Sequence, residues 1–107
     1  LLGFETETGF RKIGSRDILY LEYRNRKVRL VTLAGEFWLR ESIGAMEKRL
    51  APYGFYMPHK SFVVNFFHVK NLKGYDITMS DGSLVPLSQK KSSVFREELA
   101  VWLSEQI

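Results

Sequence analysis

The stretch Phe55–Asn65 reads FYMPHKSFVVN and sets a His-Lys-Ser trio directly against an apolar run. A buried strand disfavours an adjacent His and Lys, whereas a free loop disfavours the run Phe-Val-Val. We therefore expect the apolar side chains to anchor this segment while three polar residues are held outward: His59, Lys60 and Ser61. Such an arrangement suits a partner that carries phosphates or other hydrogen-bond acceptors.

The composition is typical of one small globular domain. Of the 107 residues, 45% are hydrophobic and 14% aromatic, which suffices for a modest core and favours strands over disorder. The chain starts at Leu1 rather than Met, so we expect residues 1–107 to be a single domain cut from a longer polypeptide. Cysteine is absent, and no apolar run approaches the roughly 18 residues that cross a bilayer. We expect a cytoplasmic domain that makes no membrane contact.

Basic residues outnumber acidic ones by 16 to 12, and the net charge of +4 makes an anionic partner the first hypothesis. The cations concentrate in three parts of the chain. One part holds Arg24, Arg26, Lys27 and Arg29, and the last holds Lys90 and Lys91. Between them, residues 48–75 contain five cations, two histidines and no acidic residue. These three parts must meet in space to form one binding surface.

Periodicity predicts a mostly β chain with antiparallel sheets. Extended segments are expected in residues 4–13, 18–23, 28–33, 36–39, 69–72, 75–79 and 84–87. Segment 18–23 is apolar on both faces and should be a central strand. Asn25 marks a hairpin with a basic tip, Asp81-Gly82 predicts a two-residue hairpin loop, and Pro86 places the last strand at an edge.

Two helices complete the predicted fold, one short and internal, the other C-terminal. Ser42 should cap the first, which ends before Pro52 and Gly54. Ser92 or Ser93 should cap the second. Its apolar residues share one face and must be covered by the sheet or by another chain: Phe95, Leu99, Trp102 and Leu103.

The residues needed for common enzymatic chemistry are missing. The sequence has no glycine-rich phosphate loop, no G-x-S-x-G elbow and no cysteine nucleophile. His59 and His68 are nine residues apart and have no carboxylate near them in sequence, so they do not predict a metal site. We expect no enzymatic activity, no cofactor and no bound metal.

Each basic cluster also has a structural interpretation. Arg24–Arg29 can be a solvated hairpin tip, Lys90-Lys91 can be a polar linker ahead of a helix, and His59 can donate to a nearby carbonyl. At the first two sites the structural interpretation and a binding role have about equal support. At His59-Lys60 the apolar context favours a binding role. The aromatic residues Tyr56, Phe66 and Phe67 are expected in the core rather than stacked on bases.

Taken in order, several motifs resemble the LytTR DNA-binding domain, the output module of many bacterial response regulators. They are Asp17–Glu22, the Thr32–Glu36 turn, the short helix ending at Leu50, Phe55 with His59–Asn65, and Pro86–Ser88. The resemblance covers roughly residues 10–96 and is most specific in the string F-x-x-x-H-K-S-F-V-V-N. It implies an elongated, mostly antiparallel β fold that binds duplex DNA through loops.

The resemblance also implies which residues contact DNA. The family's three contact regions fall on Asn25, Arg26 and Lys27, on Lys60 in the His59-Lys60-Ser61 motif, and on Lys90 with Lys91. These regions coincide with the three basic clusters. Where many relatives have Arg directly after the late Ser, this chain has Gln89. Lys60 replaces the common Arg or Asn, and an ammonium favours one point-charge contact over a bidentate contact with guanine.

The expected function is sequence-specific binding of double-stranded DNA in transcription regulation by a two-component system. The resemblance further implies direct-repeat sites, a dimer on DNA and an upstream receiver domain. The main alternative is a protein-interaction module that uses the C-terminal helix and a basic surface. A third possibility is a basic domain resting on anionic lipid.

Overall fold

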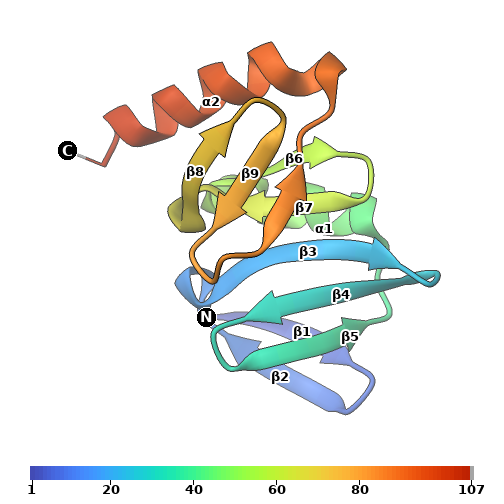
Figure 1. Ribbon diagram of the computed structural model, residues 1–107. Helices are drawn as coiled ribbons and strands as arrows, with labels where there is room; N and C mark the ends of the chain where they lie inside the picture. The colour runs from blue at the N-terminus through green and yellow to red at the C-terminus, as the bar shows by residue number, and fades with distance from the viewer. Residues whose placement is uncertain (107) are drawn as a thin grey trace.

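The computed structural model describes residues 1–106, which form two antiparallel sheets and two helices (Figure 1). The larger sheet has seven strands in the order β2-β1-β5-β4-β3-β7-β6, and the smaller has three in the order β10-β9-β8. The strands are β1 (Leu2–Thr6), β2 (Gly9–Ile13), β3 (Ile18–Arg24), β4 (Lys27–Thr32), β5 (Gly35–Leu39), β6 (Phe55–His59), β7 (Phe62–Asn65), β8 (Val69–Lys73), β9 (Asp76–Met79) and β10 (Leu84–Pro86). The helices are α1 (Ile43–Leu50) and α2 (Ser92–Ser104), and four short 3₁₀ turns are η1 (Ser15–Asp17), η2 (Ala51–Tyr53), η3 (Phe66–His68) and η4 (Gln89–Lys91). The predicted mostly β, antiparallel fold is confirmed.

Strand β3 occupies the interior of the larger sheet, as its apolar sequence predicted. It pairs with β4 on one side and with β7 on the other. Ile18 and Leu21 face one core, whereas Leu19 and Tyr20 both face the other. This departure from alternation follows from a register shift between Ile18 and Tyr20, because an extra residue in one strand reverses the side-chain phase beyond it.

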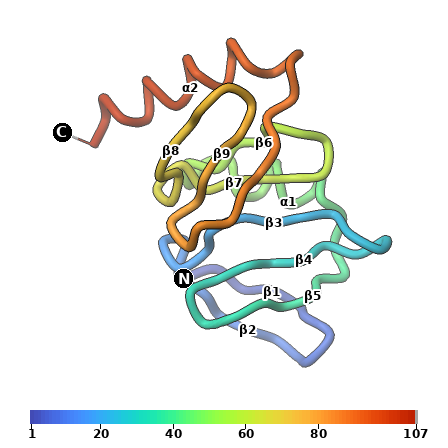
Figure 2. The backbone as a smooth tube through the Cα atoms, viewed as in Figure 1, coloured from blue at the N-terminus to red at the C-terminus, as the bar shows by residue number. Residues whose placement is uncertain are grey.

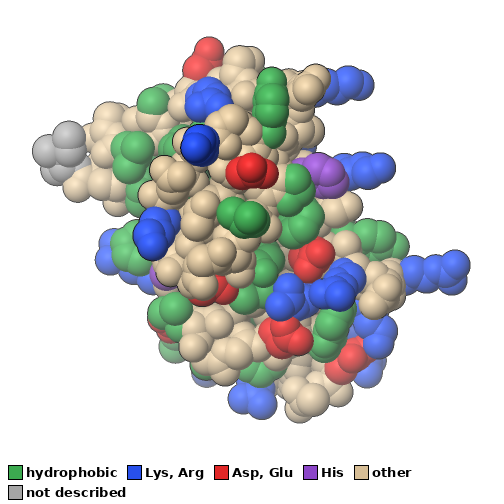
Figure 3. Space-filling view, in the orientation of Figure 1, with side chains coloured by type: hydrophobic (Ala, Val, Ile, Leu, Met, Phe, Trp, Pro, Cys, Tyr) green, Lys and Arg blue, Asp and Glu red, His purple; other side chains and the backbone are tan. Residues whose placement is uncertain are grey.

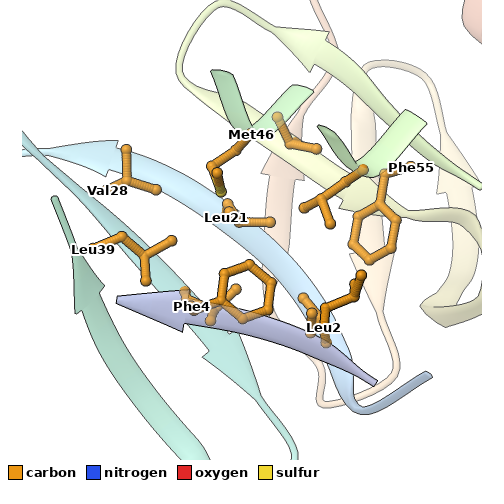
Figure 4. Close-up of a cluster of buried hydrophobic side chains, with 11 residues drawn as sticks. Leu2, Phe4, Leu21, Val28, Leu39, Met46 and Phe55 are labelled. Atoms are coloured by element: carbon orange, nitrogen blue, oxygen red, sulfur yellow. The ribbon is translucent and has the colours of Figure 1, made fainter. Parts of the chain in front are cut away.

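The larger sheet separates two hydrophobic cores. The first core contains Met46 of α1 and four residues of the sheet: Phe4, Leu21, Val28 and Leu39 (Figure 4). In the second, the opposite face of the sheet packs on the smaller sheet and on α2, which lie in front of it and above it in Figures 1 and 2. The second core is filled by residues that include Val64, Phe66, Ile77, Met79, Val85, Leu87 and Phe95. The fold is therefore a layered structure with the seven-stranded sheet in the middle.

Helix α1 begins and ends as predicted. The Ser42 hydroxyl accepts a hydrogen bond from the Ala45 amide at 3.1 Å, which caps the first turn. Met46 and Leu50 are buried, and the chain leaves the helix through η2 to Gly54, whose φ is +84°.

Helix α2 differs in part from the prediction. It begins at Ser92, the residue at its cap position is Lys91, and neither predicted serine caps it. Phe95 is buried and Leu99 and Trp102 pack against the second core, but Leu103 is 53% exposed and is not part of the covered face. The chain's own sheets therefore cover the apolar face of this helix.

The hairpin after β9 has a longer loop than predicted. The Met79 amide donates to the Ser83 carbonyl at 2.8 Å, and the Gly82 amide donates to the Met79 carbonyl at 2.9 Å. The loop is thus Ser80-Asp81-Gly82, with Gly82 at φ +88°, which is the three-residue hairpin with a left-handed third position. Pro86 lies in β10 at the edge of the smaller sheet, as expected.

The side chain of Asn65 joins segments that are far apart in the sequence. Its Nδ2 donates to the carbonyls of Ser15 at 3.0 Å and Ile18 at 2.9 Å, and its Oδ1 accepts from the Phe67 amide at 3.1 Å. Only 2% of the residue is exposed. Both ends of the amide are used, so no aliphatic side chain of similar size can replace it.

We expect Asn65→Ala to lower the free energy of unfolding by about 3 kcal/mol, because it leaves backbone groups without partners in a buried site. Urea unfolding followed by circular dichroism measures this change. The exposed Asn71 on β8 provides the control, since Asn71→Ala should change stability by less than about 0.5 kcal/mol. Equal effects of the two substitutions would contradict this role for Asn65.

Three glycines allow backbone strain to be separated from packing. Gly54 has a positive φ and a Cβ added to it would lie 2.8 Å from the Trp102 indole nitrogen, whereas Gly74 has φ +60° in open space and Gly44 lies inside α1 in open space. We expect Gly44→Ala to stabilise the fold by about 0.5–1 kcal/mol and Gly74→Ala to destabilise it by about 1 kcal/mol. Gly54→Ala should cost about 2–3 kcal/mol, because Trp102 must also move. The same urea titration orders the three variants, and a Gly54→Ala cost no larger than that of Gly74→Ala would argue against the packing contribution.

Candidate nucleic-acid interface

Backbone and side-chain hydrogen bonds bring the three basic regions together around the β6–β7 hairpin. The Tyr23 amide at the end of β3 donates to the Ser61 carbonyl at 2.8 Å. On the other side of the hairpin, the Ser88 amide donates to the Pro58 carbonyl at 2.9 Å, and the Lys91 ammonium donates to the Met57 carbonyl at 2.9 Å. The three regions are therefore neighbours in space, although they span more than sixty residues of sequence.

These regions lie on one side of the molecule. Figure 1 shows the β3–β4 turn, the β6–β7 turn and the start of α2 on the right of the view, and Figure 3 shows Lys and Arg side chains projecting there. We name this surface the cationic edge and define it by Arg24, Asn25, Arg26, Lys27, His59, Lys60, Ser61, Gln89 and Lys90. None of the nine is acidic, so the charges of the edge residues themselves are all of one sign.

The β3–β4 turn is a two-residue loop with both residues in the left-handed backbone region. Asn25 has φ 52° and Arg26 has φ 64°, and the flanking Arg24 and Lys27 pair with each other. Such a turn matches the twist of the adjoining strands. All four residues are exposed, and Lys27 forms an ion pair with Glu7 at 2.6 Å. The tip therefore presents two arginines and an asparagine, while the charge of Lys27 is shared with a carboxylate.

Arg29 belongs to the same basic cluster in sequence but lies on the sheet rather than at the edge. Its guanidinium bridges Glu22 at 3.1 Å and Glu36 at 2.6 Å. Burial by itself lowers the pKa of Arg29, but hydrogen bonds to Glu36 and Tyr20 outweigh burial and raise the pKa above its usual value. The positive charge of Arg29 is thus compensated by two carboxylates of the same sheet.

In the β6–β7 turn, the motif residues have different roles. His59 is half-buried, its Nδ1 accepts from the Ser61 amide at 3.1 Å, and its ring meets the edge of Phe62 at a centroid distance of 5.7 Å. Because Nδ1 is an acceptor, the neutral ring carries its proton on Nε2. Ser61 is half-buried and its carbonyl receives the Tyr23 amide. Lys60, between them, is exposed.

The two lysines ahead of α2 also divide in role. Lys90 is exposed, whereas Lys91 is half-buried and binds the Met57 carbonyl through its ammonium. The eight residues predicted to bind DNA fall into two groups. Four are exposed and make none of the ion pairs or hydrogen bonds given above: Asn25, Arg26, Lys60 and Lys90. The other four contact the rest of the chain: Lys27, His59, Ser61 and Lys91. Sequence reasoning omitted Arg24 from the site, although its place in the first basic cluster was the signal that could have included it.

Other candidate features belong to the fold. His68 is 7% exposed, and its ring nitrogens lie 2.9 Å from the Ser80 hydroxyl and 2.5 Å from the Arg16 carbonyl. Among residues 1–106, no group of three or more His, Cys, Asp or Glu side chains is placed to hold a metal ion. In the same described part of the chain, neither helix has the length and apolar character needed to span a bilayer. Phe67, predicted in the core, is 43% exposed with the Arg16 guanidinium stacked on its ring.

Comparisons with known proteins agree on the fold and on the family. The chain is 26% identical over 94 residues to the sensory transduction protein LytT of Bacillus subtilis and 24% identical over 105 residues to the protein of the same name in Bacillus cereus. These matches cover 83% and 94% of this chain but 39% and 43% of the relatives, so the chain spans about two fifths of their length.

A solved structure, the LytTr DNA-binding domain of a methyl-accepting/DNA response regulator from Bacillus cereus, superimposes with a TM-score of 0.79 at 26% identity. The superposition covers 92% of this chain and 94% of that domain. The family of LytTr DNA-binding domains matches residues 9–100, which include all three regions of the cationic edge. The chain therefore belongs to the LytTR DNA-binding domain family.

Proposed function

We propose that this chain binds double-stranded DNA sequence-specifically by placing the loops of the cationic edge in the grooves of the duplex. The observation that carries the proposal is the hydrogen-bonded convergence of three basic regions on the β6–β7 hairpin. A fixed spacing between the basic loops suits the regular spacing of phosphates and grooves along a double helix. The family's description as a DNA-binding domain supports the same partner.

In the proposed mechanism, phosphate contacts fix the position of the domain and base contacts select the sequence. The exposed ammonium groups of Lys60 and Lys90 neutralise phosphates and release counterions. Asn25 and Arg26 stand at the tip of a narrow two-stranded hairpin, an element that the major groove of about 12 Å can admit. Arg can pair with guanine and Asn with adenine through two hydrogen bonds each.

The relatives support a role for this chain as one domain of a longer regulator. Because the chain spans about two fifths of proteins named for sensory transduction, we propose that residues 1–107 are the output domain of a longer cytoplasmic response regulator. An upstream receiver domain would control its activity. Two copies bound as a dimer to direct-repeat sites would then regulate transcription.

The alternative function, a protein-interaction module that uses α2 and a basic surface, has less support. The face that carries Phe95, Leu99 and Trp102 packs on the chain's own second core. A partner could reach this face only by displacing the helix. The basic surface and the apolar face therefore do not form one exposed interface.

The substitution Lys60→Gln should weaken binding to every duplex and reduce the slope of log affinity against log salt by about 0.9, because one phosphate contact is lost. A fluorescence-anisotropy titration at several salt concentrations measures the slope. Lys70→Gln removes the same charge from the exposed face of β8 and should leave the slope close to that of the wild type. An unchanged slope for Lys60→Gln would remove Lys60 from the DNA contacts.

The substitution Arg26→Gly should change which sequences are preferred, since it removes a base-reading side chain while suiting the left-handed backbone of the turn. Selection from random duplexes should show weaker preference at one position of each site, with a loss of about 1–3 kcal/mol in discrimination there. Lys60→Gln, selected in parallel, should retain the wild-type consensus. An identical consensus for Arg26→Gly and wild type would refute base reading by this turn.

A further inference from the structure

A groove lies at the far end of the elements that build the cationic edge. Strand β6 begins at the groove with Phe55 and Tyr56 and ends at the edge with His59, while β7 runs in the reverse direction. Helix α2 begins beside Lys90, and its last turns form one wall of the groove. In Figure 1 the C-terminal half of α2 lies on the left, away from the edge. The groove has a volume of about 660 Å³, and none of the nine residues of the cationic edge lines it.

The groove combines aromatic rings with carboxylates. Tyr53 is 50% exposed, Phe67 is 43% exposed, and Trp102 is half-buried against Gly54. Glu98 of α2 and Glu105, the residue that follows α2, line the same groove. They are seven residues apart, and the backbone of Glu105 stays in the right-handed helical region with its amide bonded to the Val101 carbonyl, so both lie on one side about two helical turns from each other. Aromatic faces beside carboxylates are complementary to a cation.

The carboxylate charge also reaches Tyr56, another residue that lines the groove. The pKa of Tyr56 is raised first by burial and then by the charges of Glu98 and Glu47. Glu98 therefore acts on the groove interior even though its own side chain is exposed. The two carboxylates of the groove outnumber its one cation, Arg16, so the sign of charge is opposite to that of the cationic edge. DNA is consequently a poor occupant of the groove.

One wall of the groove already binds a guanidinium group of the chain itself. The Cζ of Arg16 lies 4.6 Å from the centroid of the Phe67 ring, and both residues line the groove. The same groove is lined by two further rings, Tyr53 and Trp102, and by the carboxylates of Glu98 and Glu105. Arg suits such a place better than Lys, because its planar group stacks on rings and pairs with a carboxylate in the same geometry.

We propose that this groove is a docking site for an arginine-bearing segment of a partner protein, used while the opposite edge holds DNA. The charge complementarity with Glu98 and Glu105, the exposed ring of Tyr53 and the half-buried ring of Trp102 support this occupant. The site does not depend on the proposed DNA contacts, so each can fail without the other. A regulator built this way binds DNA at one end and a protein at the other.

The test is a titration of the ¹⁵N-labelled chain with a blocked peptide, acetyl-Gly-Arg-Leu-Arg-Gly-amide, followed by NMR. We expect the indole N–H signal of Trp102 to shift, while that of Trp38 on β5 stays in place as an internal control. The double substitution E98Q/E105Q should weaken peptide binding about fivefold, in line with the loss of two partly exposed ion pairs. E97Q changes an exposed α2 carboxylate outside the groove lining and should leave the affinity unchanged.

Several results would overturn the proposal. They are equal shifts with acetyl-Gly-Glu-Leu-Glu-Gly-amide, no shift of Trp102, or a peptide affinity that E98Q/E105Q does not change while the variant retains the wild-type spectrum. A Trp102 shift that depends on protein concentration without peptide would assign the groove to a second copy of the chain. K60Q should leave peptide binding unchanged even where it weakens DNA binding, and a loss of peptide binding in K60Q would place the peptide elsewhere.

Discussion

The pairing of β7 with β3 is the interaction on which the remaining structure depends. Within this four-residue strand, Val63 fills the first core, Val64 fills the second, and Asn65 fastens the strand end to η1 and the start of β3. At the other end of the strand, the Ser61 carbonyl holds the Tyr23 amide. The same few residues thus join both cores and set the position of the β3–β4 turn beside the β6–β7 turn. A change in core packing at β7 would therefore also change the spacing of the charged loops.

Much of this fold could be predicted from the sequence, because its signals are local. Apolar patterns indicated the strands other than β6 and β7, whose segment was expected only to be anchored by its apolar residues. Ser42, Gly54 and Pro86 marked a helix start, a turn and a sheet edge. Two details of the fold could not be predicted because they depend on contacts between distant residues. The bulge in β3 turns Leu19 and Tyr20 to the same side, and the Gly82 loop gains a third residue through the pairing of Met79 with Ser83. Neither effect has a signature in adjacent residues.

The candidate site could be predicted by region but not by residue. Three basic clusters and the His-Lys-Ser motif indicated the regions that the fold brings together. Whether a basic residue is free at the surface or bonded within the fold depends on partners that are far away in the sequence. Lys91 differs from Lys90 because the Met57 carbonyl lies within reach, and Lys27 differs from Arg26 because Glu7 lies beside it. The groove at the opposite end was missed because its residues come from several separate segments, and no one of them is unusual alone.

The left-handed backbone at Arg26 means that folding and the base reading proposed for this turn make opposite demands on one position. A glycine or asparagine would adopt φ 64° with less strain than a residue with a long side chain does, yet neither supplies a guanidinium at the apex of the hairpin. The domain therefore gives up some thermodynamic stability to keep an arginine there. Among diverging relatives, we expect this turn to drift quickly toward easier residues wherever pressure to keep one target site is relaxed, so new binding preferences should arise here first.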